Sequence, residues 1–210
     1  MKIRVLTTIF LVFISCKNVS DKETEQVQIV VDSTGLKIEK AEKYIGISKL
    51  NSFLENPLNL REFKKKKKRE VTTSVSNGKE YYFNPKNKDS IFYSYFFPDL
   101  KKESIKMDEI VVFKYGENKH TYDDEIETLI EFRIFNPDSD LGKANLYGLT
   151  KTELESEFGT DYLTFDNGIA YSNKNKILTI ELNDSKVKSF RYIKLNTENV
   201  DQDLIQQIIE

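Results

Sequence analysis

The stretch from residue 148 to residue 193 constrains the fold of this chain most strongly, because local signals for a helix and several strands follow one another along it. Thr150 followed by Glu153 forms a capping box, in which each residue satisfies a backbone N–H at the start of a helix. Gly159 can end that helix because glycine adopts positive φ at little cost. These signals predict a short helix over residues 151–158.

Turn signals and alternating apolar residues then predict strands. Residues 166–168, Asp-Asn-Gly, form a hairpin signal, and a second turn signal at residues 183–185 separates the apolar runs 177–182 and 187–193. About four antiparallel strands in a meander follow from this pattern. Residues 200–209 carry apolar side chains at helical spacing, which predicts a terminal helix.

The first half of the chain carries similar signals. Ser48 can cap a helix that buries Leu50, Phe53 and Leu54 before Pro57 ends it. Strand signals follow at residues 71–76, 81–83, 90–97, 109–115 and 126–135.

The predicted fold class is α+β, with short helices packed on an antiparallel β-meander. Residues 46–49, Gly-Ile-Ser-Lys, echo residues 148–151, Gly-Leu-Thr-Lys, and the echo is compatible with two tandem helix-plus-meander units. The halves would span residues 29–136 and 137–210. One continuous domain remains the alternative.

The second half resembles the small lipoproteins of the outer-membrane assembly factor BamE (SmpA/OmlA) type, and the β-lactamase inhibitor protein has the same architecture in tandem. The resemblance rests on residues 148–150, Leu154, residues 158–159 and the strand pair around residues 183–187. It covers about 50 of the 210 residues. It implies a non-enzymatic protein that works by binding another protein.

The first sixteen residues have the layout of a secretory signal. Lys2 and Arg4 precede the uncharged run 5–14, which is about half the roughly 20 apolar residues that span a bilayer. A cleaved signal peptide over residues 1–15 is therefore favoured over a permanent membrane helix. Residues 16–28 are polar and lack aromatic residues, which predicts an anchor and a flexible tether.

Residues 13–16, Phe-Ile-Ser-Cys, resemble the lipobox of bacterial lipoproteins, although Phe13 stands where leucine is usual. The resemblance implies that Cys16 is alkylated with diacylglycerol and becomes the acylated N-terminus. Two or more acyl chains suffice for stable membrane attachment. Lys17 stands where an Asp would resemble the inner-membrane retention signal of enteric bacteria, which favours the outer membrane. An ordinary secreted protein whose signal happens to end in Cys is the alternative.

Composition narrows the function classes. The net charge is -2, and Lys outnumbers Arg 27 to 5, which argues against a nucleic-acid partner. The chain has one Cys and one His, so neither a zinc site nor Cys/His catalysis is expected. His120 follows a turn signal, and no nucleophile-elbow, zincin or P-loop motif is present. We therefore expect no enzyme activity, no metal site and no cofactor.

Two clusters are candidate binding sites. Residues 64–69, KKKKKR, include Lys65, Lys66 and Lys67 and could attract anionic lipid or an acidic partner, or could be a solvated segment. Residues 91–97 hold five aromatic residues. On a strand, Tyr93, Tyr95 and Phe97 share one face and form either a buried core or an aromatic binding surface.

The sequence thus predicts a lipid-anchored protein of the bacterial cell envelope that binds an unidentified protein, in assembly or as an inhibitor or immunity factor. The alternative is a lipoprotein that binds a small ligand or a glycan through the aromatic strand.

The anchor can be tested directly. Because acylation needs the thiol, Cys16→Ala should abolish lipid attachment and release the protein from membranes. Fractionation with immunodetection measures this, and Ser20→Ala in the predicted tether serves as a control that should stay membrane-bound. A Cys16→Ala protein that fractionates like the wild type would contradict the lipoprotein hypothesis.

Overall fold

A computed structural model describes residues 36–66, 72–85, 89–98, 106–121, 127–137 and 139–210. The helices are α1 (Leu36–Glu55), α2 (Leu60–Lys66), the 3-10 helix η1 (Ser139–Ala144), α3 (Lys151–Phe158) and α4 (Gln202–Ile209). The strands are β1 (Thr72–Ser76), β2 (Ser90–Phe97), β3 (Asp108–Tyr115), β4 (Thr128–Ile134), β5 (Leu163–Phe165), β6 (Gly168–Asn173), β7 (Lys176–Asn183) and β8 (Lys186–Lys194).

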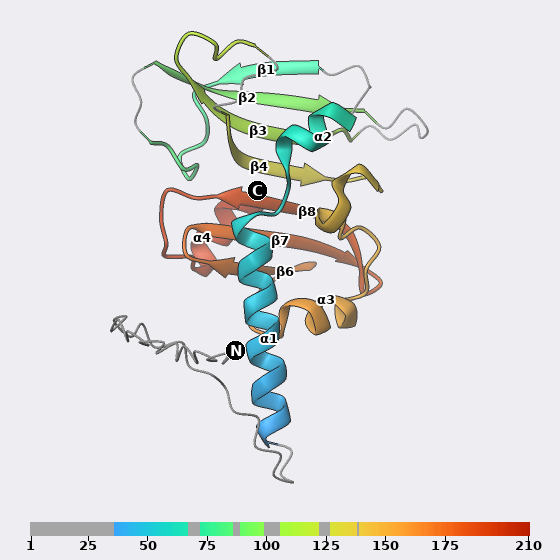
Figure 1. The fold of residues 1–210 in the computed structure, drawn as a ribbon. Helices are drawn as coiled ribbons and strands as arrows, with labels where there is room; N and C mark the ends of the chain where they lie inside the picture. Colours follow the sequence, from blue (N-terminus) through green and yellow to red (C-terminus); the bar gives the residue numbers. More distant parts are fainter. Residues whose placement is uncertain (1–35, 67–71, 86–88, 99–105, 122–126, 138) are drawn as a thin grey trace, which may run out of the picture. The chain divides into compact units, whose positions relative to one another are not determined.

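All eight strands belong to one antiparallel sheet in the order β1-β2-β3-β4-β8-β7-β6-β5 (Figure 1). Strands that are consecutive in the chain pair as neighbours, except that β4 pairs with β8 in the middle of the sheet. This arrangement confirms the predicted α+β class with an antiparallel meander. β1 and β5 are the two edge strands.

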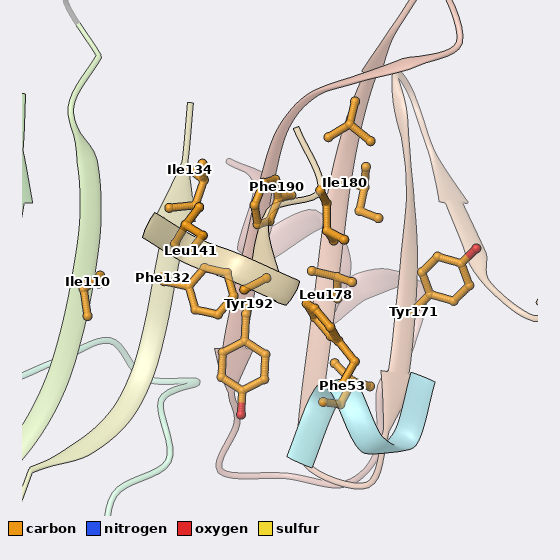
Figure 2. Packing of buried hydrophobic residues seen from close by; sticks show 14 of the residues in the cluster. Phe53, Ile110, Phe132, Ile134, Leu141, Tyr171, Leu178, Ile180, Phe190 and Tyr192 are labelled. Carbon is orange, nitrogen blue, oxygen red and sulfur yellow. The ribbon is translucent and has the colours of Figure 1, made fainter. Parts of the chain in front are cut away.

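One face of the sheet is covered by α1, α2, η1 and α3 (Figure 1). Alternate strand residues point to this face, as the two-residue period of a strand requires. Figure 2 shows Phe53 of α1 and Leu141 of η1 on the same side of the sheet as Phe132, Leu178 and Tyr192. Burial of these apolar side chains is the main contribution to the stability of the helix layer.

The opposite face is covered by α4 (Figure 1). Ile205 and Ile208 of α4 pack with Ile177 and Ile193 of the sheet in a second apolar cluster. Asp201 accepts a hydrogen bond from the Leu204 N–H and so caps the helix. The terminal helix predicted from apolar spacing is therefore confirmed.

Local signals placed α3 and the strands around it correctly. The helix spans the predicted residues, and both hydrogen bonds of the capping box between Thr150 and Glu153 are present. Asp166 and Asn167 form the turn between β5 and β6, one residue earlier than the Asn-Gly signal predicts, and Gly168 is the first residue of β6. Asp184 and Ser185 lie in the turn between β7 and β8. Asp184 and Ser185, which form the second of these turns, both have positive φ.

The start of the first helix differs from the prediction. α1 begins at Leu36, so Ser48 is an exposed interior residue and not a helix cap. The predicted burial of Leu50, Phe53 and Leu54 is confirmed. Gly46 faces the end of α3, where an added Cβ would lie 2.9 Å from the backbone nitrogen of Gly159. Close approach of two backbones therefore explains a glycine in the interior of α1.

Two further expectations need correction. Residues 81–83 are not a strand, because only Tyr82 forms a bridge, to Leu195, and its ring packs in the α4-side cluster. The echo between residues 46–49 and 148–151 does not mark equivalent positions, since the first lies inside α1 and the second enters α3.

Among the described residues, no helix is both long and apolar enough to cross a bilayer.

The glycine contact gives a stability prediction. Gly46→Leu should lower the free energy of unfolding by about 2 kcal/mol, because overpacking against a backbone outweighs the gain of roughly 1 kcal/mol in helix propensity. Ser48→Ala should leave it unchanged or raise it by a few tenths of a kcal/mol, whereas loss of a helix cap would cost about 1 kcal/mol. Urea denaturation of both variants measures the difference. A stable Gly46→Leu protein would show that α1 and α3 do not approach closely.

Candidate functional site

A groove of about 840 Å³ runs between α1 and α3 beside η1. We call it the α1–α3 groove. Its apolar wall is formed by Phe53, Leu146 and Phe158, which are buried, and by Leu149, which is half-buried. The rings of Phe53 and Phe158 lie 5.2 Å apart between their centroids, so the two helices meet at the bottom of the groove through an aromatic pair.

Polar and charged side chains form the rim of the groove. They are Ser48, Lys49, Ser52, Lys143, Glu153, Ser156 and Glu157. Lys49 Nζ and Glu157 Oε2 are 2.9 Å apart and join α1 to α3, but both side chains are half-exposed, so the pair contributes little to stability. The Thr150 backbone N–H and hydroxyl donate to Glu153 and hold the pKa of that carboxyl below its usual 4.5.

One groove residue carries an unsatisfied polar atom. The side-chain oxygen of Asn145 is buried and accepts no hydrogen bond from the part of the chain that the structure describes. A buried acceptor without a partner costs roughly 1–3 kcal/mol.

The exposed surface of α1 extends the apolar character of the groove. Tyr44 is 70% exposed and Ile45 is 54% exposed. Ile45 lies three and four residues before Ser48 and Lys49, so it shares their helix face and continues the line of the groove. A smaller hollow of about 280 Å³ on the other side of α1 is lined by Ile47 and Leu163 among others.

The lysines of the predicted cluster differ in their exposure to solvent. Lys64 is buried, and its ammonium donates to Glu127 Oε1 and lies 4.8 Å from the Tyr95 ring centroid. Lys65 and Lys66 are exposed in the last turn of α2. Lys67 lies outside the described residues. A binding role stays a prediction for Lys65, Lys66 and Lys67.

The aromatic strand is mainly core. Tyr95 is fully buried and Phe97 is 1% exposed, where it packs against Phe63 of α2 at 5.3 Å. These two residues therefore follow the buried-core alternative, because α2 covers them. Tyr93 is half-buried and remains a candidate. Lys114 Nζ lies 5.0 Å from the centroid of the Tyr93 ring.

Cys16 also lies outside the described residues, so its lipidation stays a prediction. His120 is exposed in a turn. The described residues include no group of three or more His, Cys, Asp or Glu side chains that could hold a metal ion.

A buried polar network that the sequence did not reveal lies on the α4 face of the sheet. Arg191 of β8 donates from Nε to Glu131 Oε1 at 2.5 Å and from Nη2 to Glu131 Oε2 at 3.0 Å. The Tyr82 hydroxyl also donates to Glu131. Arg191 further donates to the Tyr81 hydroxyl at 2.8 Å and to the Ile208 carbonyl at 2.5 Å. This arrangement ties α4 and residues 81–82 to the sheet.

The network determines the ionisation of its members. Burial alone would raise the pKa of Glu131, but the charge and hydrogen bonds of Arg191 and the bond from Tyr82 outweigh it and lower the pKa below 4.5. Burial raises the pKa of Tyr82, and Glu131 raises it further. Burial would lower the pKa of Arg191, but Glu131 and Tyr81 raise it. Glu131 is therefore a fixed carboxylate engaged in structural bonds.

The ion pair gives a second stability prediction. Glu131→Gln should lower the free energy of unfolding by about 3–5 kcal/mol at neutral pH, because it leaves the buried Arg191 guanidinium without its counter-charge. Replacing both residues, as Glu131→Leu with Arg191→Met, should cost less than the sum of the single substitutions.

The same pair has a defined pH dependence. Because the folded pKa of Glu131 is lowered, its contribution is complete above the ordinary value of 4.5 and is lost as the pH falls through the folded value. The difference between wild type and Glu131→Gln should therefore shrink below pH 4.5. Urea titrations across this range measure it, and a constant difference would contradict the assignment.

Comparisons of the chain with protein-family models, with curated proteins and with solved structures found no match.

Proposed function

We propose that this protein is a lipid-anchored module of the bacterial cell envelope that binds another protein and has no catalytic role. The observation that carries the proposal is the α1–α3 groove, which combines an apolar wall, a polar rim and exposed apolar residues of α1 beside it. Apolar centres surrounded by polar rims are typical of protein interfaces.

The groove suits a protein better than a small polar substrate. Its side chains come from three helical elements on the outside of the sheet, and Tyr44 and Ile45 extend beyond it along α1. A helix that exposes a tyrosine and an isoleucine in adjacent positions gains free energy when a partner covers them. The rim carries Lys49, Lys143, Glu153 and Glu157, so both signs of charge are available to orient the partner.

The anchor supports an envelope location. The lipobox-like context of Cys16 supports acylation there, which would insert the start of the mature chain in a membrane, and Lys17 favours the outer membrane. The lipid would hold the folded residues close to the membrane surface and raise the effective concentration for a partner there.

Within this class, we propose an assembly factor or an inhibitor of the immunity type. The two differ in genetics: an immunity protein has a tight partner encoded next to it, and its loss is toxic when that partner is present. The burial of Tyr95 and Phe97 argues against the small-ligand alternative, because a ligand cannot reach these side chains.

We also propose that the sheet consists of two tandem units. In support, α1 and α2 precede the meander β1–β4, while η1 and α3 precede the meander β5–β8, and the last strands of the two meanders pair with each other.

A pair of substitutions on α3 tests the groove. Ser156 is exposed and lines the groove, whereas Thr152 is exposed on the same helix and is not among its lining residues. Ser156→Arg places a long side chain into the groove and should reduce the recovery of a co-purifying protein at least about tenfold, while Thr152→Arg should leave it unchanged. Purification of the full chain from membranes, with mass spectrometry of bound proteins, measures both.

Equal recovery with both variants would exclude the groove as the docking surface. Detection of no specific protein with the wild-type chain would remove the support for a protein-binding function. Matched thermal melting curves are the control for folding, because both positions are exposed.

A further inference from the structure

The two edges of the sheet differ in their protection. An edge strand presents unpaired backbone N–H and C=O groups that another strand can join, and natural proteins usually blunt such edges. At one edge, β5 has only three residues, and the side chain of Gln202 in α4 donates to the Thr164 carbonyl at 3.0 Å. This edge is short and partly capped by α4.

At the other edge, β1 has five residues, and no helix side chain in the described part of the chain is hydrogen-bonded to its backbone. Its sequence, Thr-Thr-Ser-Val-Ser, contains no charged residue and no proline, and residues 73–76 are all exposed. Val75 is 52% exposed. All five residues of β1 pair with β2 in regular register, so the strand carries no bulge that would twist it away from a partner.

An apolar pair beside this edge can receive a side chain from an added strand. Val75 lies opposite Tyr93 of β2, and the two side chains point to the helix-covered face. Tyr93 is half-buried and Val75 is exposed, so the apolar surface continues outward to the edge. An incoming strand would present every second side chain on the face of Val75, and one of these side chains would lie directly opposite it.

The charge near the edge is positive. The Phe63–Phe97 contact places the last turn of α2 at the end of β2, and the adjacent Phe96 pairs with Thr72 at the start of β1 (Figure 1). Lys65 and Lys66 of that turn are exposed; Lys65 Nζ lies 3.6 Å from Glu62 Oε1, so Lys66 supplies the larger part of the net positive charge of this turn. The start of the edge strand therefore lies in a positively charged environment.

We propose that β1 receives an extended acidic segment of a partner protein, which adds to the sheet as a ninth strand. Backbone hydrogen bonds supply the affinity, an apolar residue beside Val75 sets the register, and acidic residues next to Lys65 and Lys66 set the direction. A second copy of this chain is disfavoured, because it would bring a second pair of exposed lysines, Lys65 and Lys66, to the same edge. This surface is separate from the α1–α3 groove and stands on its own observations.

The test uses the full chain purified in detergent and two labelled octapeptides. One alternates valine with glutamate, and the other alternates valine with lysine. Fluorescence anisotropy at low ionic strength should show binding of the acidic peptide at least about tenfold tighter than that of the basic peptide, with loss of affinity as salt is added. Amide exchange of residues 73–76 should slow with the acidic peptide.

Two matched substitutions locate the site. Val75→Glu and Leu163→Glu each place a carboxylate at an exposed apolar position, one on each edge strand of the sheet. Val75→Glu should weaken binding of the acidic peptide at least about tenfold, while Leu163→Glu should not change it. Lys65→Glu with Lys66→Glu should weaken it as well.

The proposal is overturned if the two peptides bind alike, if Val75→Glu has no effect, or if the acidic peptide does not bind at about 1 mM. A concentration-dependent dimer that Val75→Glu dissociates, without peptide binding, would instead assign the edge to a second copy. These outcomes are independent of the Ser156→Arg test, so failure at the edge leaves the groove proposal standing.

Discussion

The pairing of β4 with β8 is the contact on which the rest of the structure depends. It joins the meander β1–β4 to the meander β5–β8 in a single sheet. A different side-chain interaction links β4 and β8 on each face of the sheet. On the helix-covered face, the rings of Phe132 and Tyr192 stack at 5.4 Å with an interplanar angle of 15°. On the α4 face, Glu131 and Arg191 form a buried ion pair. Loss of either partner would leave the other's charge buried at the centre of the sheet without a counter-charge.

This central joint also determines where binding surfaces can occur. Arg191 holds the end of α4 through the Ile208 carbonyl, so α4 covers the face opposite the other helices. The helix layer on the first face leaves the α1–α3 groove open, and the meander that begins at β1 leaves one long edge strand uncovered by α4. The groove and the edge differ in chemistry: the first offers apolar side chains, and the second offers backbone hydrogen bonds in a positive environment.

Agreement between sequence and structure is best where short-range chemistry decides the conformation. The bounds of α3 follow from a capping box that involves residues three apart, and the hairpin between β5 and β6 turns at Asp166 and Asn167, which are residue types that favour turns. The start of α1 could not be predicted in this way. Ser48 satisfies a local rule for helix caps, but it lies inside α1. The helix also places Gly46 against Gly159 at the end of α3, a contact between residues more than a hundred positions apart that no local rule predicts.

The sequence by itself determined the α+β class and the positions of most strands, of α3 and of α4. It also predicts that Cys16 is acylated. Each of these depends on residues that are near one another in the chain. Only the tertiary structure decided that Tyr95 and Phe97 lie under α2, that Lys64 is buried with Glu127, and that Glu131 and Arg191 pair at the centre of the sheet. A strand sequence shows which side chains share a face, but whether a helix or solvent covers that face depends on how distant segments pack.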